Sequence, residues 1–267
     1  MTVVAGVAGQ PSAHSLSPLI HTAWIAAAGL DADYRAFGPA DAAEFAALVA
    51  EGRSGGLRGL NVTAPFKEQA LALALADEAS VTARTCGSAN LLLFGDGRVR
   101  ADNTDGAGLM AALAEQAPGL DVRNQFVVVL GAGGAARAAV AALKAAGADV
   151  GVLNRTRARA ETLAAELGAT AVEAGALEQA ALVVNALSVP PDLDMSRLRD
   201  EAVLMDMTYR PLVTPFLAEG RARGLATVDG LAMLIGQARP SFRALFGQIP
   251  PEIDVRALAL AALGETP

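Results

Sequence analysis

Two lysines stand out in a chain that otherwise uses arginine for its positive charge. Of the 21 basic residues, only Lys67 and Lys144 are lysines. Lysine can give up a proton near neutral pH in suitable surroundings, whereas arginine effectively cannot. Lys67 ends the stretch Asn61-Val62-Thr63-Ala64-Pro65-Phe66-Lys67, at an expected turn from strand to helix. It is therefore a candidate for proton transfer, and an ordinary surface lysine is the alternative interpretation.

Two further clusters of polar residues follow expected strands. The stretch Asp102-Asn103-Thr104-Asp105-Gly106 carries two acids, of which helix capping accounts for only one. In Ser15-Leu16-Ser17-Pro18 two hydroxyls are separated by one residue, so both can face a ligand, or one of them can cap the next helix. Both clusters are candidate ligand-binding loops.

A glycine-rich turn marks a candidate dinucleotide site. The apolar strand expected over residues 126–130 leads directly into Gly131-Ala132-Gly133-Gly134-Ala135-Ala136. Gly131, Gly133 and Ala136 fill the three positions of the G-x-G-x-x-[G/A] turn, in which backbone N–H groups at a helix start face a pyrophosphate. A purely structural turn is the alternative, but the strand before it and the Ala-rich helix after it favour a nucleotide.

An arginine cluster follows about 20 residues later, where NAD enzymes usually carry an acidic residue for the ribose. This chain instead has Asn154-Arg155-Thr156-Arg157-Ala158-Arg159. Arginines in the first turns of a helix oppose its dipole unless an anion lies among them. A ribose 2′-phosphate suits the guanidinium groups and the Thr156 hydroxyl. The cluster therefore predicts NADP, with an exposed arginine-rich helix face as the alternative.

The elements that must position these residues form two blocks of alternating strands and helices, which predicts an α/β fold built on parallel sheets. Ser17 is expected to cap a first helix, and later helices are expected from about Asp41 to Glu51 and from Pro65. In the first block, strands are expected at residues 3–7, 34–37, 89–94 and 99–101, with a further strand that ends at residue 63. In the second block, strands are expected at residues 126–130, 150–153, 182–186, 203–207 and 226–228. The last helices, 231–246 and 254–263, follow no new strand and are expected to pack on the first block.

Composition restricts the possible classes of protein. The chain is 53% hydrophobic and 18% charged, which predicts a globular protein, and its net charge of −7 disfavours nucleic-acid and anionic-membrane surfaces. No apolar run approaches the roughly 20 residues of a spanning helix, and the N-terminus lacks a secretory pattern, so a soluble cytoplasmic protein is expected. Cys86 is the single cysteine, and the spacing of His14 and His21 does not suit a metal site, so no disulfide and no metal are expected.

Taken together, these stretches closely resemble the shikimate dehydrogenase family, in the same order and over nearly the whole chain. The matching segments are 9–18, 61–67, 102–106, 131–137, 154–159, Tyr209 and 230–237. The resemblance implies reversible, NADPH-dependent reduction of 3-dehydroshikimate to shikimate in aromatic amino-acid (chorismate) biosynthesis. Hydride would pass between nicotinamide C4 and substrate C3.

The resemblance also implies a role for each site residue. Lys67 and Asp105 would be catalytic and flank the C3 oxygen. Ser15, Ser17 and Tyr209 would hold the substrate carboxylate, while Asn61, Thr63, Asn90, Asp105 and Gln237 would bind ring hydroxyls. NADP would be bound by Gly131, Ala132, Gly133, Gly134, Ala135, Asn154, Arg155, Thr156, Arg159, Gly230 and Met233.

The fold implied by the family has two α/β domains with a cleft between them. Residues 1–103 with 236–267 would form the substrate domain, and residues 104–235 a Rossmann-like NADP-binding domain with a parallel sheet, in a monomer or homodimer. Leu91 and Leu187 stand where the family commonly has threonine, which affects the surroundings of Asn90 and of the cofactor. A quinate/shikimate dehydrogenase with broader substrate or cofactor use and a noncatalytic NADP-binding sensor remain as alternatives.

Overall fold

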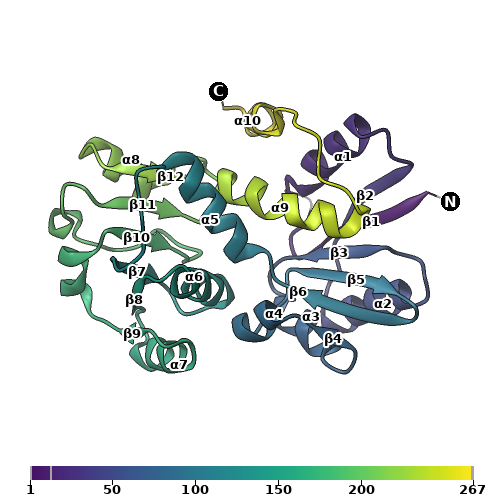
Figure 1. The fold of residues 1–267 in the computed structure, drawn as a ribbon, viewed down its shortest axis with the longest axis horizontal. Helices are drawn as coiled ribbons and strands as arrows, with labels where there is room; N and C mark the ends of the chain where they lie inside the picture. Colours follow the sequence, from purple (N-terminus) through teal and green to yellow (C-terminus); the bar gives the residue numbers. More distant parts are fainter. Residues whose placement is uncertain (1, 13, 266–267) are drawn as a thin grey trace. The chain divides into compact units, whose positions relative to one another are not determined.

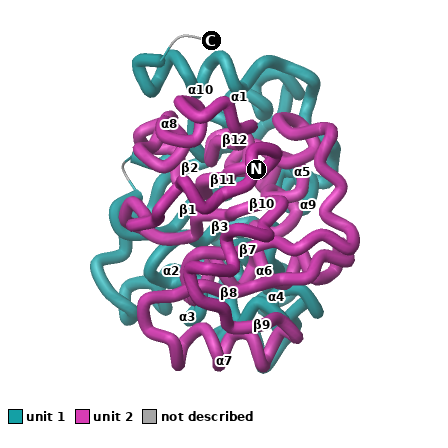
Figure 2. Tube along the Cα trace, turned by 90° about the vertical axis from the view of Figure 1, so that its left-hand side faces the viewer, with its two compact units in different colours: residues 1–104, 238–267 teal, residues 105–237 magenta. Residues whose placement is uncertain are grey.

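The computed structural model describes residues 2–12 and 14–265. The chain divides into two compact units (Figure 2): unit 1 contains residues 1–104 and 238–267, and unit 2 contains residues 105–237. Each unit is built on a six-stranded sheet with helices packed against it (Figure 1). The α/β fold expected from the sequence is therefore confirmed.

Unit 1 contains a mixed sheet. Its strands are β1 (Val3–Ala8), β2 (Ala32–Phe37), β3 (Gly59–Val62), β4 (Glu78–Ala79), β5 (Leu91–Gly95) and β6 (Arg98–Asp102), in the order β2-β1-β3-β5-β6-β4. Its helices are α1 (Ser17–Ala27), α2 (Ala42–Arg53), α3 (Lys67–Ala74), α4 (Val81–Cys86), the C-terminal part of α9 (Gly230–Phe246) and α10 (Val255–Leu263).

The first sheet is parallel only in part, which the sequence pattern did not predict. Strand β5 runs antiparallel to both of its neighbours, β3 and β6. The cause is the dipeptide Asp96-Gly97, which joins β5 to β6 with φ of 51° and 72°. Positive φ at both central residues defines a tight hairpin turn, and a two-residue connection can join only antiparallel strands.

The two faces of this sheet are covered by different helices. Helices α2, α3 and α4 pack on one face around a core that includes Phe45, Leu60, Phe66 and Leu92. The C-terminal part of α9 and the whole of α10 also belong to unit 1. There the Arg58 Nε donates a hydrogen bond to the carbonyl of Leu245 in α9 at 3.2 Å, and α10 packs against α1. The expectation that the C-terminal helices return to the first block is confirmed.

Two expected helix starts in unit 1 differ from the structure. Ser17 is the first residue of α1 rather than its cap, and the Oγ of Ser15 accepts a hydrogen bond from the Ser17 N–H at 3.2 Å. Helix α3 begins at Lys67 rather than Pro65, because Pro65 lies in a turn closed by the hydrogen bond from the Phe66 N–H to the Thr63 carbonyl. The short elements β4 and α4 were not predicted.

An aromatic cluster lies between α1 and β2. His21 is buried and stacks on Tyr34, with ring centroids 4.1 Å apart and planes 2° apart, while Trp24 packs edge-on against it. Burial lowers the pKa of His21 from 6.5 to about 3. The imidazole is therefore neutral in the folded protein at neutral pH.

This burial predicts a pH dependence of stability. Between pH 3 and 6.5 the unfolded chain binds a proton at His21 that the folded protein excludes. The free energy of unfolding should therefore fall as pH drops through this window, by up to about 1.4 kcal/mol per pH unit from this residue. His21→Phe keeps an aromatic ring but does not titrate, so its denaturant unfolding should depend less steeply on pH than that of the wild type. Equal slopes would contradict this prediction.

Unit 2 contains a fully parallel sheet. Its strands are β7 (Phe126–Leu130), β8 (Asp149–Leu153), β9 (Thr170–Ala171), β10 (Leu182–Asn185), β11 (Val203–Asp206) and β12 (Ala226–Val228). Its helices are α5 (Asp105–Gln116), α6 (Gly134–Ala145), α7 (Arg157–Leu167), η1 (Ala174–Gln179), η2 (Met195–Arg197), α8 (Pro215–Ala222) and the start of α9. The strand order is β12-β11-β10-β7-β8-β9, and every pairing is parallel.

This order is the Rossmann order. Numbered within the unit and followed from β9, the strands run 3-2-1-4-5-6, so the order reverses between β7 and β10. Alternate residues of β7 enter opposite cores: Val127 and Val129 face α5, α6 and α7, whereas Val128 and Leu130 face η1, η2 and α8. Burial on both faces explains why β7 is a continuous apolar run. The Rossmann prediction is confirmed.

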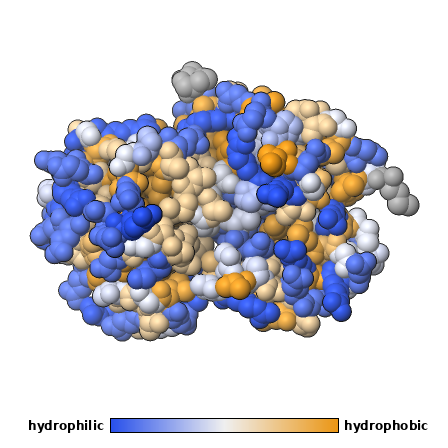
Figure 3. Space-filling model, in the orientation of Figure 1, coloured by the Kyte–Doolittle hydropathy of each residue, from blue (hydrophilic) through white to orange (hydrophobic). Residues whose placement is uncertain are grey.

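The outer surface carries both hydrophilic and hydrophobic residues. On the face drawn in Figure 3, apolar side chains lie between hydrophilic ones. In residues 2–12 and 14–265, no helix has the length and apolar character needed to cross a membrane. Within the same residues, no group of three or more His, Cys, Asp or Glu side chains is placed to hold a metal ion.

Candidate functional site

In unit 1 one edge of the sheet collects the predicted substrate residues. Strands β1 and β3 are parallel, so the loops that follow them leave from the same edge. Strand β5 is antiparallel to β3 and pairs Leu91 with Asn61, so β5 begins at this edge. The residues placed there are Ser15, Ser17, Asn61, Thr63, Lys67 and Asn90.

The loops after β1 and β3 are pressed together at this edge. The Gln10 N–H donates to the Ala64 carbonyl at 3.0 Å, and a Cβ on Gly9 would collide with Cγ2 of Thr63. Only glycine permits this approach, which places the start of the loop that leads to Ser15 and Ser17 beside Thr63. Ser17 is buried and Ser15 is half-buried.

The start of α3 is tied to the start of β5. The Ala89 N–H donates to the Lys67 carbonyl at 2.8 Å, and the Val62 N–H donates to the Asn90 carbonyl at 2.8 Å. These main-chain bonds fix the backbone of Lys67 relative to β3 and β5. Its side chain is half-buried at the first position of the helix.

A buried network of side chains holds the two asparagines of this edge. Asn90 Oδ1 accepts from the Thr104 N–H at 2.7 Å, and Asn90 Nδ2 donates to Thr104 Oγ1 at 3.0 Å. Thr104 Oγ1 lies 3.3 Å from Ser241 Oγ, which accepts from Asn61 Nδ2 at 2.9 Å. Ser241, in the C-terminal half of α9, was not predicted, since no local motif marks it.

In unit 2 the predicted catalytic acid begins a helix. Asp105 is the first residue of α5 and is only 2% exposed. Helix α5 packs closely on α9 at Gly108, where a Cβ would lie 2.6 Å from the Met233 carbonyl and 2.8 Å from Gln237 Cβ. The structure therefore places the helix that starts at Asp105 against the α9 segment that carries Met233 and Gln237.

The loop that carries Tyr209 is anchored by a buried carboxylate. Asp206, 1% exposed, accepts hydrogen bonds from Asn185 Nδ2 at 3.0 Å, Thr214 Oγ1 at 2.7 Å and the Thr208 N–H at 2.9 Å. A buried charge needs such partners. The same loop touches the start of α9, where a Cβ on Gly230 would lie 2.5 Å from the Thr208 carbonyl oxygen.

The glycine-rich turn joins β7 to α6 at the point where the strand order reverses. Gly131 has φ of 110°, which side chains rarely allow, and Ala136 is fully buried against the sheet. Gly133 occupies the N-cap position of α6 without any side-chain cap, and apart from its chain neighbours no described residue has a heavy atom within 4 Å of where its Cβ would be. Helix N–H groups are thus left available beside open space, which suits a pyrophosphate.

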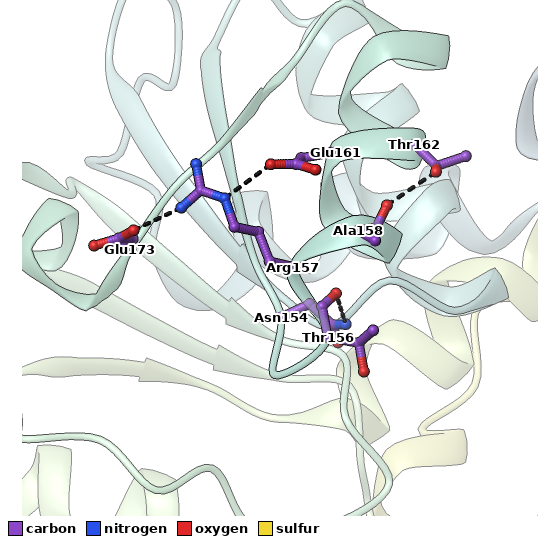
Figure 4. Close-up of polar contacts among 7 residues, drawn as sticks. All are labelled: Asn154, Thr156, Arg157, Ala158, Glu161, Thr162 and Glu173. Carbon is purple, nitrogen blue, oxygen red and sulfur yellow. Dashed lines mark hydrogen bonds and ion pairs between the residues drawn. The ribbon is translucent and has the colours of Figure 1, made fainter.

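The arginine cluster lies in the next loop, after β8, and Figure 4 shows its polar contacts. Asn154 Nδ2 donates to the Thr156 carbonyl at 2.9 Å, which closes the turn, and Thr156 occupies the N-cap position of α7 without using its hydroxyl as a cap. Arg155, Thr156 and Arg159 are exposed. Within the described residues, neither Arg155 nor Arg159 has an ion-pair partner.

Arg157 differs from the other two arginines. Its Nε pairs with Glu161 at 2.8 Å and its Nη1 with Glu173 at 2.6 Å (Figure 4). The hydrogen bond to Glu161 and the charges of both glutamates raise the pKa of Arg157. With Asn154 and Glu173 it also lines a surface hollow of about 230 Å³. Two acids therefore already compensate the charge of Arg157, which is not among the residues predicted to bind the cofactor.

The fold and these loops define a two-unit α/β protein of the dinucleotide-binding class. Residues 7–92 match the family model of the shikimate dehydrogenase substrate binding domain, and residues 112–190 match that of shikimate / quinate 5-dehydrogenase. Together the matches span more than half of the chain. A shikimate dehydrogenase (NADP(+)) of Caulobacter vibrioides is 54% identical over 98% of this chain and 96% of its own length. The chain belongs to the shikimate dehydrogenase family.

Solved structures agree with this membership. Shikimate 5-dehydrogenase from Thermus thermophilus, in complex with NADP(H) and shikimate, superposes with a TM-score of 0.87 at 38% identity and covers 94% of this chain and 95% of its own. Quinate dehydrogenase from Corynebacterium glutamicum, in complex with NAD, also has a TM-score of 0.87, at 29% identity, and covers 97% and 99% of the two chains. Both substrate specificities therefore occur on this fold.

Proposed function

We propose that the protein is an NADP-dependent shikimate dehydrogenase, which catalyses the reversible reduction of 3-dehydroshikimate to shikimate. The observation that carries the proposal is the 54% identity, over almost the full length of both chains, to a shikimate dehydrogenase (NADP(+)). Residues 1–103 with 236–267 are proposed as the substrate domain and residues 104–235 as the NADP-binding domain. We also propose that the protein acts in the biosynthesis of aromatic amino acids, that it is located in the cytoplasm, and that it is a monomer or a homodimer.

Substrate binding is assigned to hydroxyl and amide groups. Ser15, Ser17 and Tyr209 are proposed to bind the carboxylate, to which hydroxyl groups donate well. Asn61, Thr63, Asn90 and Gln237 are proposed to bind ring hydroxyls. Two observations at one edge of the unit 1 sheet support these assignments. Gly9, at the start of the loop that leads to Ser15 and Ser17, lies against Thr63, and Asn61 bonds the Asn90 carbonyl.

Proton transfer is assigned to Lys67 and Asp105. Hydride transfer is the chemistry that NADP supplies when bound. The side chains of Lys67 and Asp105 are proposed to hold and move the proton on the substrate C3 oxygen, so that the hydroxyl loses its proton as shikimate is oxidised and regains it in the reverse direction.

The loops of unit 2 fit NADP better than NAD. The turn 131–135, with Gly230 and Met233, is proposed to bind the dinucleotide, and Asn154, Arg155, Thr156 and Arg159 its 2′-phosphate. Arg155 and Arg159 are exposed cations beside an unused N-cap hydroxyl, and a ribose-binding acid is replaced by Asn154. Leu187 packs against the glycine turn, with Cδ2 3.1 Å from the Cβ position of Gly131.

A quinate/shikimate dehydrogenase is the second candidate, because a quinate dehydrogenase shares this fold at 29% identity. A noncatalytic NADP-binding sensor is a third, and the presence of both Lys67 and Asp105 speaks against it. The test of catalysis is direct: adding shikimate to the protein with NADP⁺ should produce a rise in NADPH absorbance, with one 3-dehydroshikimate formed per NADPH. No rise, in a protein that binds NADP⁺, would indicate a sensor instead.

A further inference from the structure

The side chain of Asn61 is almost fully used by the protein itself. Asn61 lies on β3 and is half-buried. Its Oδ1 accepts a hydrogen bond from the Tyr34 hydroxyl at 2.8 Å. Its Nδ2 donates to Ser241 Oγ at 2.9 Å and to the Asn90 carbonyl at 3.3 Å. These are all the hydrogen bonds of this side chain among the described residues.

The partners also fix which way the amide points. A backbone carbonyl can only accept, so the Asn90 carbonyl requires that Nδ2, and not Oδ1, faces it. Oδ1 then faces Tyr34. An amide offers two N–H donors and an oxygen with two lone pairs. In Asn61 both N–H groups of Nδ2 and one lone pair of Oδ1 are already used by protein partners. A ligand therefore finds one hydrogen-bond acceptor on this side chain, the second lone pair of Oδ1.

The two residues that hold the amide are rigidly placed. Tyr34 is 4% exposed and its ring stacks on His21. Burial raises the pKa of Tyr34, so its hydroxyl keeps the proton that it donates. Ser241 is fully buried, and its Oγ lies 3.3 Å from Thr104 Oγ1, which is bonded to Asn90. A shift of Ser241 would therefore disturb both asparagines.

We propose that Tyr34 and Ser241 are positioning residues that hold the Asn61 amide so that it presents one acceptor to a hydroxyl of the substrate. The inference rests on the proposed function, in which Asn61 binds a ring hydroxyl. It adds a chemical specification, namely that this ligand group must be a hydrogen-bond donor. A keto oxygen or a carboxylate oxygen would face the lone pair of Oδ1 and be repelled.

The test uses variants that remove one hydrogen bond each. Tyr34→Phe keeps the ring stacked on His21, and Ser241→Ala keeps the helix. Each is expected to raise the Kd and KM for shikimate about three- to tenfold, the effect of one neutral hydrogen bond, with kcat and the KM for NADP within about twofold of wild type. Ser54→Ala is the matched control, since it also removes one serine hydrogen bond in the same unit, and the partner of Ser54 is the Glu51 carbonyl, outside this network.

A double-mutant cycle separates positioning from a general structural effect. If Tyr34 acts through Asn61, Tyr34→Phe should leave the shikimate Kd unchanged when Asn61 is already alanine. The same loss in both backgrounds, or no loss in the wild-type background, would overturn the proposal. If Asn61→Ala itself leaves the Kd unchanged, the proposal fails while shikimate turnover by the wild type still supports the proposed function. Absence of that turnover would overturn both.

Discussion

Lys67→Met is expected to lower kcat for shikimate oxidation by at least about 100-fold, because a general acid or base typically contributes about 10²- to 10⁴-fold. Methionine preserves much of the length and apolar character of the side chain but cannot carry a proton. The main-chain bond from Ala89 to the Lys67 carbonyl does not depend on the side chain, so the start of α3 should be retained. Initial rates at saturating shikimate and NADP⁺ measure the effect.

The chain offers a natural control in its only other lysine. Lys144 lies in the last turn of α6, where it makes only a small interaction with the helix dipole. Lys144→Met should keep kcat within about twofold of wild type. Turnover of Lys67→Met within about tenfold of wild type, with a normally folded protein, would show that Lys67 does not handle the proton.

Replacing both Arg155 and Arg159 by alanine is expected to raise the Kd for NADP⁺ about 100-fold, because charge-assisted hydrogen bonds to a phosphate are stronger than neutral ones. NAD⁺ lacks the 2′-phosphate, so its Kd should change by less than about threefold. The preference between the cofactors should therefore fall or reverse. Equilibrium titrations of the double variant with both cofactors measure this difference directly.

Arg157→Ala is the matched control, because it removes one positive charge from the same helix. Its guanidinium is already paired with Glu161 and Glu173, so we expect a change in the NADP⁺ Kd of less than about threefold. An equal loss of affinity for NADP⁺ and NAD⁺ in the double variant would mean that the arginines act through the overall field or the fold. An effect of Arg157→Ala as large as that of the double variant would contradict the assignment of the phosphate ligands.

Elements with strong local patterns could be predicted from the sequence. Strand β7 and strand β12 have the predicted bounds, because short apolar runs between clear turns define them. The glycine turn, the Rossmann unit and the return of the C-terminal helices follow from the same kind of pattern. The two-residue strands β4 and β9 could not be predicted, since two residues show no periodicity.

The direction of β5 was predictable but was missed. The dipeptide Asp96-Gly97 between two apolar runs is a strong hairpin signal, and it decides that β5 and β6 are antiparallel. The sequence pattern predicted βαβ units through most of the chain, and this hairpin was not singled out. Ser17 was predicted to be the N-cap of α1 because serine before proline is a common N-cap residue. In the structure the Ser15 hydroxyl accepts the hydrogen bond from the Ser17 N–H instead.

The support of the candidate site could not be predicted, because it depends on tertiary contacts. Ser241 lies 180 positions from Asn61 in the sequence, and Tyr34 lies 27 positions from it. A buried serine in an apolar helix and a tyrosine in a strand carry no local signal for such a role. The pairing of Arg157 with Glu173, 16 positions away, is likewise visible only in the fold.

We expect the protein to oxidise shikimate with NADP⁺ as the hydride acceptor. The most direct measurement compares initial rates for four combinations, namely shikimate or quinate with NADP⁺ or NAD⁺, on the same preparation of the full chain. We predict that shikimate with NADP⁺ has the highest kcat/KM of the four combinations. Faster NAD⁺-linked oxidation of quinate would contradict it.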